Sequence, residues 1–123
     1  MKRPGVVAMA ISVALVAGGL ATAARAGAGD VIPVPTDKTS IYMTLEQTAK
    51  PNGVVEVITE RSGEKGHFYT VRDCDCPVSK YRILGQGKTM DEARQRYPSD
   101  GLMELVKGSV SYDICTHACA SKP

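Results

Sequence analysis

Four cysteines and one of the two histidines are the side chains in this 123-residue chain whose types and spacing could do chemistry. Cys74 and Cys76 form a C-x-C pair, and Cys115 and Cys119 form a C-x3-C pair that encloses His117. An even number of cysteines in a small exported domain is typical of a disulfide framework. We therefore predict two structural disulfides.

The connectivity of these disulfides follows from the direction of the two segments that carry them. A bond between Cys74 and Cys76 would close a very small strained ring, which leaves two pairings that tie residues 74–76 to the C-terminal segment. Each closes a loop of about 40 residues and stabilises the fold by roughly 3–4 kcal/mol on the chain-entropy account. If the two segments are antiparallel, Cys74 pairs with Cys119 and Cys76 with Cys115. We expect this pairing, with the parallel one as the open alternative.

A metal site is the alternative interpretation of the same residues. The thiolates of Cys74, Cys76, Cys115 and Cys119, or three of them with His117, could hold Zn²⁺, and a C-x-C pair can suit Cu(I). Structural zinc sites favour C-x2–4-C spacing at both ends, however, and the first pair is too close for that. An oxidising compartment also works against free thiolates. The sequence therefore predicts no metal and no other cofactor.

Catalytic motifs are weak throughout the chain. Residues 85–89 (GQGKT) look like part of a phosphate-binding loop, but Arg82 stands where that motif needs its first glycine. No nucleophile signature such as G-x-S-x-G accompanies His67 or His117. We expect no enzymatic activity and name no catalytic residue.

The N-terminus carries a targeting pattern. Lys2 and Arg3 precede the apolar run 6–17, and small residues then lead to an A-x-A site that ends at Ala26. This order is typical of a secretory signal peptide, and the apolar run is shorter than the roughly 20 residues that span a bilayer. We predict cleavage after Ala26 and a periplasmic or secreted protein with no membrane attachment after cleavage.

Charge excludes one class of partner. The whole chain has 15 Lys+Arg and 13 Asp+Glu, but Lys2, Arg3 and Arg25 would leave with the signal peptide, giving 12 − 13 = −1 for residues 27–123. A near-neutral domain without a basic stripe is not suited to nucleic acid. The sequence leaves the oligomeric state open.

The pattern of apolar residues predicts a small α+β domain over residues 39–123, preceded by a flexible leader, 27–38. An antiparallel meander of about four to five strands is expected, because several segments alternate in polarity and Asn52-Gly53 is a strong turn signal. Thr89 and Glu92 match a capping box, so a helix is expected near 89–97. Leu102–Val106 could form one or two helical turns. The expected strands are 41–46, 54–60, 67–76, 81–84 and 110–115.

Taken together, these features predict a small exported protein, stapled by two disulfides, that works by binding. It is expected to be an accessory or inhibitor-like protein of the cell envelope. Its partner would be another envelope or extracellular protein, met through a sheet edge or the 99–108 loop.

Overall fold

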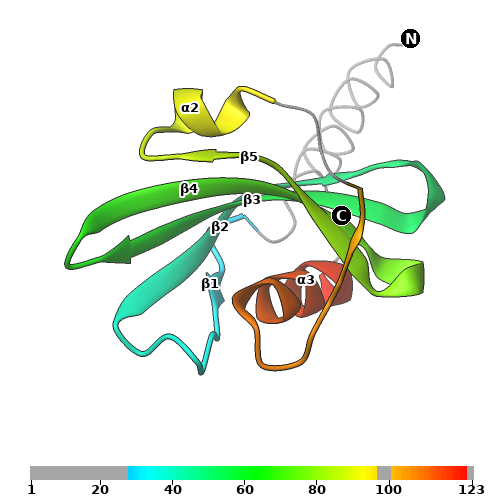
Figure 1. Cartoon of the computed structure of the whole chain (residues 1–123), viewed down its shortest axis with the longest axis horizontal. Coiled ribbons are helices and arrows are strands. Elements are labelled where there is room, and N and C mark those ends of the chain that lie inside the picture. The colour runs from blue at the N-terminus through cyan, green and yellow to red at the C-terminus, as the bar shows by residue number, and fades with distance from the viewer. Residues whose placement is uncertain (1–27, 97–100, 122–123) are drawn as a thin grey trace, which may run out of the picture.

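The computed structural model describes residues 28–96 and 101–121, and these form an antiparallel sheet with a helix on each face (Figure 1). The predicted signal peptide lies outside the described residues. In the described part of the chain, six strands pair in sequence order, so the sheet is a meander with β1 and β6 at its edges. The α+β class is confirmed, with six strands instead of four or five. They are β1 (Val31–Ile32), β2 (Ser40–Ala49), β3 (Val54–Gly63), β4 (Gly66–Asp75), β5 (Lys80–Gly87) and β6 (Met103–Glu104).

The turn between β2 and β3 forms where the sequence predicts it. Asn52 and Gly53 both have positive φ, at 66° and 79°. Asparagine and glycine tolerate this region, which most side chains avoid. The turn lets β2 and β3 pair along most of their lengths, with an irregularity between Thr44 and Glu46.

Helix α3 (Val110–Ala120) covers one face of the sheet. Alternation along β4 directs Arg72 and Cys74 to this face, because successive strand residues point to opposite sides. The α3 face contains the larger of two apolar clusters, to which β1 also contributes. Its buried members are Ile32, Val34, Tyr42, Val55, Val57, Cys74, Ile114, Cys115 and Ala118.

Helix α2 (Met90–Arg94) lies on the other face, against β5 and β4. The Thr89 half of the predicted capping box is present, because Thr89 Oγ1 accepts from Glu92 N–H at 3.1 Å. The Glu92 carboxylate accepts from Lys88 N–H at 2.7 Å, one residue before the N-cap amide that a capping box would use. Gly85 in β5 allows α2 to approach the strand closely, because a Cβ at this position would lie 2.1 Å from the carbonyl oxygen of Ala93. The helix is shorter than predicted, and Tyr97 lies outside the described residues.

The last predicted strand, 110–115, is wrong, because these residues begin α3. These residues also fit a helical pattern: Ile114 and Cys115 lie three and four residues after Ser111, and Ala118 lies four and three residues after them. All four are buried on one side of the helix. Ser109 caps this helix through its hydroxyl, which accepts from Tyr112 N–H at 3.2 Å. Packing against the sheet therefore favours a helix over a strand for these residues.

Two further expectations are corrected at the sheet edges. The leader is not free of regular structure, because Val31 and Ile32 pair with β2, and Ile32 and Val34 are buried under α3. Leu102–Val106 is not helical: Met103 and Glu104 form β6 and pair with the start of β5. Both edge strands are two residues long, which limits the edge open to unwanted pairing.

Candidate functional site

The four cysteines meet where α3 packs against the end of β4 and the residues just after it. Cys74 is bonded to Cys115 with a Cα–Cα distance of 5.5 Å, and Cys76 is bonded to Cys119 with a distance of 5.8 Å. Two disulfides were predicted and are present. The first bond is fully buried, whereas Cys76 and Cys119 are partly exposed at the border of the α3 cluster.

The expected pairing of Cys74 with Cys119 and Cys76 with Cys115 is wrong. It assumed a strand antiparallel to β4, but the segment is a helix that runs so that Cys115 meets Cys74 and Cys119 meets Cys76. Two residues along an extended chain span about 6.6 Å, and four residues along a helix span about 6 Å. The C-x-C and C-x3-C spacings therefore match across the interface, and both bonds form side by side.

The disulfides take up every sulfur of the alternative metal site. A cysteine binds a metal as its thiolate, and a disulfide sulfur is not a thiolate. His117 also lies apart from the sulfurs, because it is two residues from each helical cysteine and so on a different side of α3. Its Nε2 contacts Asp30 Oδ2 at 3.2 Å. In this disulfide-bonded form the four sulfurs are therefore not available as metal ligands.

The segment 101–108 beside the disulfides carries exposed apolar side chains. Leu102, Met103 and Val106 are 39%, 43% and 63% exposed, while Leu105 turns inward against the α3 cluster. Leu105 N–H donates to the Ser79 carbonyl at 3.1 Å, and Glu104 is the register partner of Lys80. Hydrogen-bonded and non-bonded pairs alternate along an antiparallel ladder, so the backbone N–H and C=O of Glu104 point outward. We call residues 101–108 the edge segment.

A hollow of about 210 Å³ separates the edge segment from α3. Leu105 lines it from the edge segment and Tyr112 from α3, and the Cys76–Cys119 disulfide also contributes to the lining. Exposed apolar side chains next to a hollow are a common feature of protein-binding surfaces. The disulfides thereby fix the position of α3, which forms one wall of this surface.

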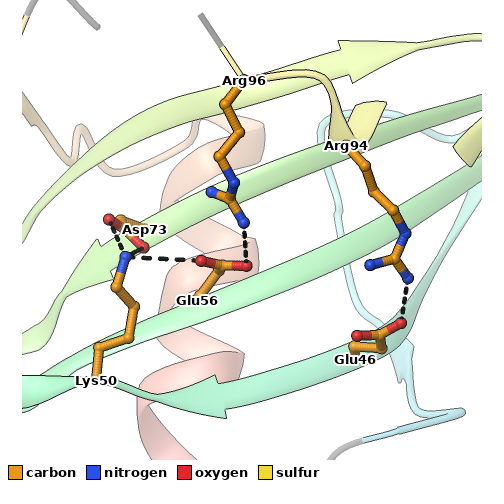
Figure 2. A network of polar contacts seen from close by, with 6 residues as sticks. All are labelled: Glu46, Lys50, Glu56, Asp73, Arg94 and Arg96. Carbon is orange, nitrogen blue, oxygen red and sulfur yellow. Dashed lines mark hydrogen bonds and ion pairs between the residues drawn. The ribbon is translucent and has the colours of Figure 1, made fainter. Parts of the chain in front are cut away.

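The α2 face carries a network of ion pairs instead of disulfides (Figure 2). Lys50 Nζ lies 2.9 Å from Asp73 Oδ2 and 3.6 Å from Glu56 Oε1, and Arg96 contacts the other oxygen of Glu56 at 2.8 Å. A separate pair joins Arg94 of α2 to Glu46 of β2. Each charge in the network contacts an opposite charge. We therefore interpret the network as a structural contact that holds the residues after α2 against the strands.

One buried cation was not identified as a site residue from the sequence. Arg72 is only 7% exposed, and burial lowers its pKa to about 10. Its Nε donates to Ser111 Oγ at 3.1 Å and its Nη1 to Thr59 Oγ1 at 3.4 Å. Alternation along β4 places Arg72 on the same face as Cys74, so a buried arginine could have been anticipated there. Its burial, however, depends on α3, and the sequence analysis predicts a strand at 110–115 in place of this helix.

The described residues bring Ser62, His67 and Glu60 together at the tip of the β3–β4 hairpin. Ser62 Oγ lies 3.2 Å from His67 Nδ1, and Glu60 contacts the same nitrogen. A proton relay needs the hydroxyl and the carboxylate on different ring nitrogens. This exposed cluster therefore does not have the geometry of a nucleophilic site.

Comparison with protein-family models, with curated proteins and with solved structures finds no match for this chain. Within residues 28–96 and 101–121, no helix is long and apolar enough to cross a membrane. Two disulfides and this absence are compatible with an exported protein.

Proposed function

We propose that this chain is a small exported protein that acts by binding another envelope or extracellular protein, as an accessory or inhibitor-like factor. The contact surface in this proposal is the edge segment. The observation that carries the proposal is the group of three apolar side chains there, which stay exposed although α3 and the α3 cluster lie beside them. Leaving apolar area in water costs free energy, and a partner would recover it.

The outer side of β6 supports the same proposal. The outward backbone groups of Glu104 can pair with an extended segment of a partner, as in strand addition, where backbone hydrogen bonds supply affinity and side chains supply specificity. Leu102 and Val106 flank β6 and would contact that segment. The proposal concerns binding alone and assigns no catalytic role to this surface.

Export is tested on the full chain, expressed with residues 1–26 in a bacterium with an oxidising periplasm. We expect a product that begins at Gly27 and is four hydrogens lighter than the fully reduced chain. A product that keeps residues 1–26, or one found in the cytoplasm with four free thiols, would contradict the export part of the proposal.

The contact surface is tested with a photo-crosslinking residue placed at Val106, in cells that make the protein naturally. The matched control is the same residue at Ile41, an apolar side chain 57% exposed at the opposite end of the sheet. We expect a discrete heterologous protein adduct at position 106 that is absent at position 41 and is lost on Met103→Lys. Equal adducts at both positions, no adduct at 106, or an adduct with a second copy of this chain would overturn the proposed surface.

A further inference from the structure

Arg72 also faces a second hollow, separate from the edge segment. It has a volume of about 220 Å³ and lies on the α3 face of the sheet, where Val110 at the start of α3 forms part of its wall. The strands supply the remaining lining, which includes two arginines and no acidic residue. The polar members are Tyr42, Thr59, Arg61, Thr70, Arg72 and Gln86.

The charge of Arg72 has no carboxylate partner among the described residues. Its two acceptors are the neutral hydroxyls of Ser111 and Thr59. A guanidinium has five N–H donors, so donors remain after these two bonds are made. Burying a cation without an opposite charge is unfavourable, and such groups in proteins are usually paired. The fold therefore keeps a buried positive charge beside an open space.

Other groups around this hollow are also favourable to an anion. Arg61 lines it from β3, with its Cζ 5.3 Å from the centre of the Phe68 ring. Val110 at the N-terminus of α3 also borders the hollow, so the positive end of the helix dipole lies nearby, with Asp113 in the same first turn. Asp37 lines the adjacent hollow together with Arg61, and it accepts a hydrogen bond from Tyr42 Oη at 2.7 Å. Asp37 does not line the hollow that contains Arg72, but through Tyr42 its carboxylate is the acidic group next to it.

We infer that this hollow binds a small oxyanion, a phosphate or carboxylate group, with Arg72 as the buried cation and Arg61 as the cation at its mouth. The guanidinium fork suits the paired oxygens of both groups. Two cations without an acid in the lining favour phosphate, which carries the larger negative charge. The hydroxyls of Thr59 and Thr70 supply short polar contacts that orient the bound group. The site does not depend on the proposed protein contact at the edge segment.

The test is a titration of the oxidised, ¹⁵N-labelled protein with sodium phosphate and, separately, with sodium acetate. Sodium chloride at equal ionic strength provides the reference. We expect saturable shifts of the Arg72 Nε–H resonance and of the Thr59, Thr70 and Val110 amides, with phosphate binding more tightly than acetate. Saturable binding of acetate alone would identify the carboxylate as the source of the oxyanion.

Three variants locate the binding. We expect Arg72→Met to weaken it about tenfold or more, and Arg61→Gln about three- to tenfold, because each removes charge-assisted hydrogen bonds. The matched control is Arg82→Gln: Arg82 is the register partner of Asp73 and so lies on the α2 face, and its loss should change affinity less than about twofold. Arg61 is exposed, so its variant keeps the test valid if Arg72→Met does not fold. The inference is overturned if neither anion gives shifts beyond those of chloride, or if Arg61→Gln and Arg82→Gln reduce affinity equally.

Discussion

Helices α3 and α2 lie on opposite faces of one sheet, and the chain secures them by different means. Helix α3 is joined by two covalent bonds to Cys74 in β4 and to Cys76 just after β4, and by a cluster with nine buried members. Helix α2 has no covalent bond to the sheet, and its cluster has three buried members, Ile58, Val71 and Ala93. A cap, a close contact with β5 and ion pairs provide the rest of its attachment.

The difference follows from the sequence distance that each contact spans. Helix α2 begins three residues after β5, the strand it covers, so little chain entropy is lost in bringing them together. The disulfides join residues 41 and 43 positions apart, and they restrict the unfolded chain across that whole distance. The disulfides therefore secure a packing contact that is remote in sequence, whereas the packing of α2 on β5 is local and noncovalent. The Arg94–Glu46 ion pair of α2 also spans 48 residues, but it is a partly exposed contact.

Removing a disulfide should have the largest effect on stability. The double variant Cys74→Ala/Cys115→Ala should lower the free energy of unfolding by roughly 4 kcal/mol or more, from lost loop restriction and from the cavity left at a fully buried bond. The variant Cys76→Ala/Cys119→Ala opens a loop of similar length, but its cysteines are partly exposed, so we expect a smaller loss of stability. Urea unfolding under non-reducing conditions measures both. Equal losses, or a larger loss for the second pair, would contradict the assignment of the first bond as the buried one.

Displacing α2 should have the next largest effect. Gly85→Ala would place a methyl group against the Ala93 carbonyl oxygen, so we expect a loss of about 1–3 kcal/mol from overpacking. Hydrogen exchange should show faster exchange in α2 and unchanged protection in α3. If α3 loses protection to the same extent, the two faces are not independent and the comparison fails.

The cap of α2 should contribute less. Thr89→Ala removes the side-chain acceptor for Glu92 N–H and should cost about 1 kcal/mol. Thr89→Ser keeps a hydroxyl at this position and serves as the control, with most of the stability retained. Urea unfolding distinguishes the two variants. A loss for serine equal to that for alanine would show that the hydrogen bond is not the source of the effect.

The ion-pair network should have the smallest and most salt-sensitive effect. Lys50→Met removes the cation between Asp73 and Glu56, and we expect a loss of about 0.5–1 kcal/mol at low ionic strength. The loss should shrink in 1 M salt because the charges are partly exposed and screened. A loss that does not change with salt would mean that Lys50 acts through the packing of its aliphatic chain.

The sequence predicts the α2 face better than the α3 face, for a physical reason. The central strands, the Asn52-Gly53 turn and the Thr89–Glu92 cap depend on residues close together in the chain, and all were found where expected. Helix α3 was predicted as a strand because Val110, Tyr112 and Ile114 alternate with polar neighbours. The helical spacing of Ile114, Cys115 and Ala118 favours a helix only when the sheet is present to bury these three side chains.

The errors at the candidate site follow from that single error. With a strand at 110–115, the antiparallel argument selects the wrong cysteine pairing. It also gives no reason to bury Arg72, whose partner Ser111 lies on α3. The edge segment lies within the 99–108 loop that the sequence analysis offers as a contact surface, and that role stays a prediction. Its pairing with β5 joins residues that only the folded sheet brings together.

Direct mapping of the disulfides in the unreduced protein tests the central claim, that Cys115 and Cys119 of α3 are bonded in the same chain order to Cys74 of β4 and to Cys76 just after β4. Cleavage before aspartate separates Cys74 from Cys76, and electron-transfer fragmentation of the linked peptide that begins at Asp113 then identifies each partner. We predict Cys74 with Cys115, Cys76 with Cys119, and no free thiol. Four free thiols with metal released on unfolding, or Cys74 bonded to Cys119, would contradict the account.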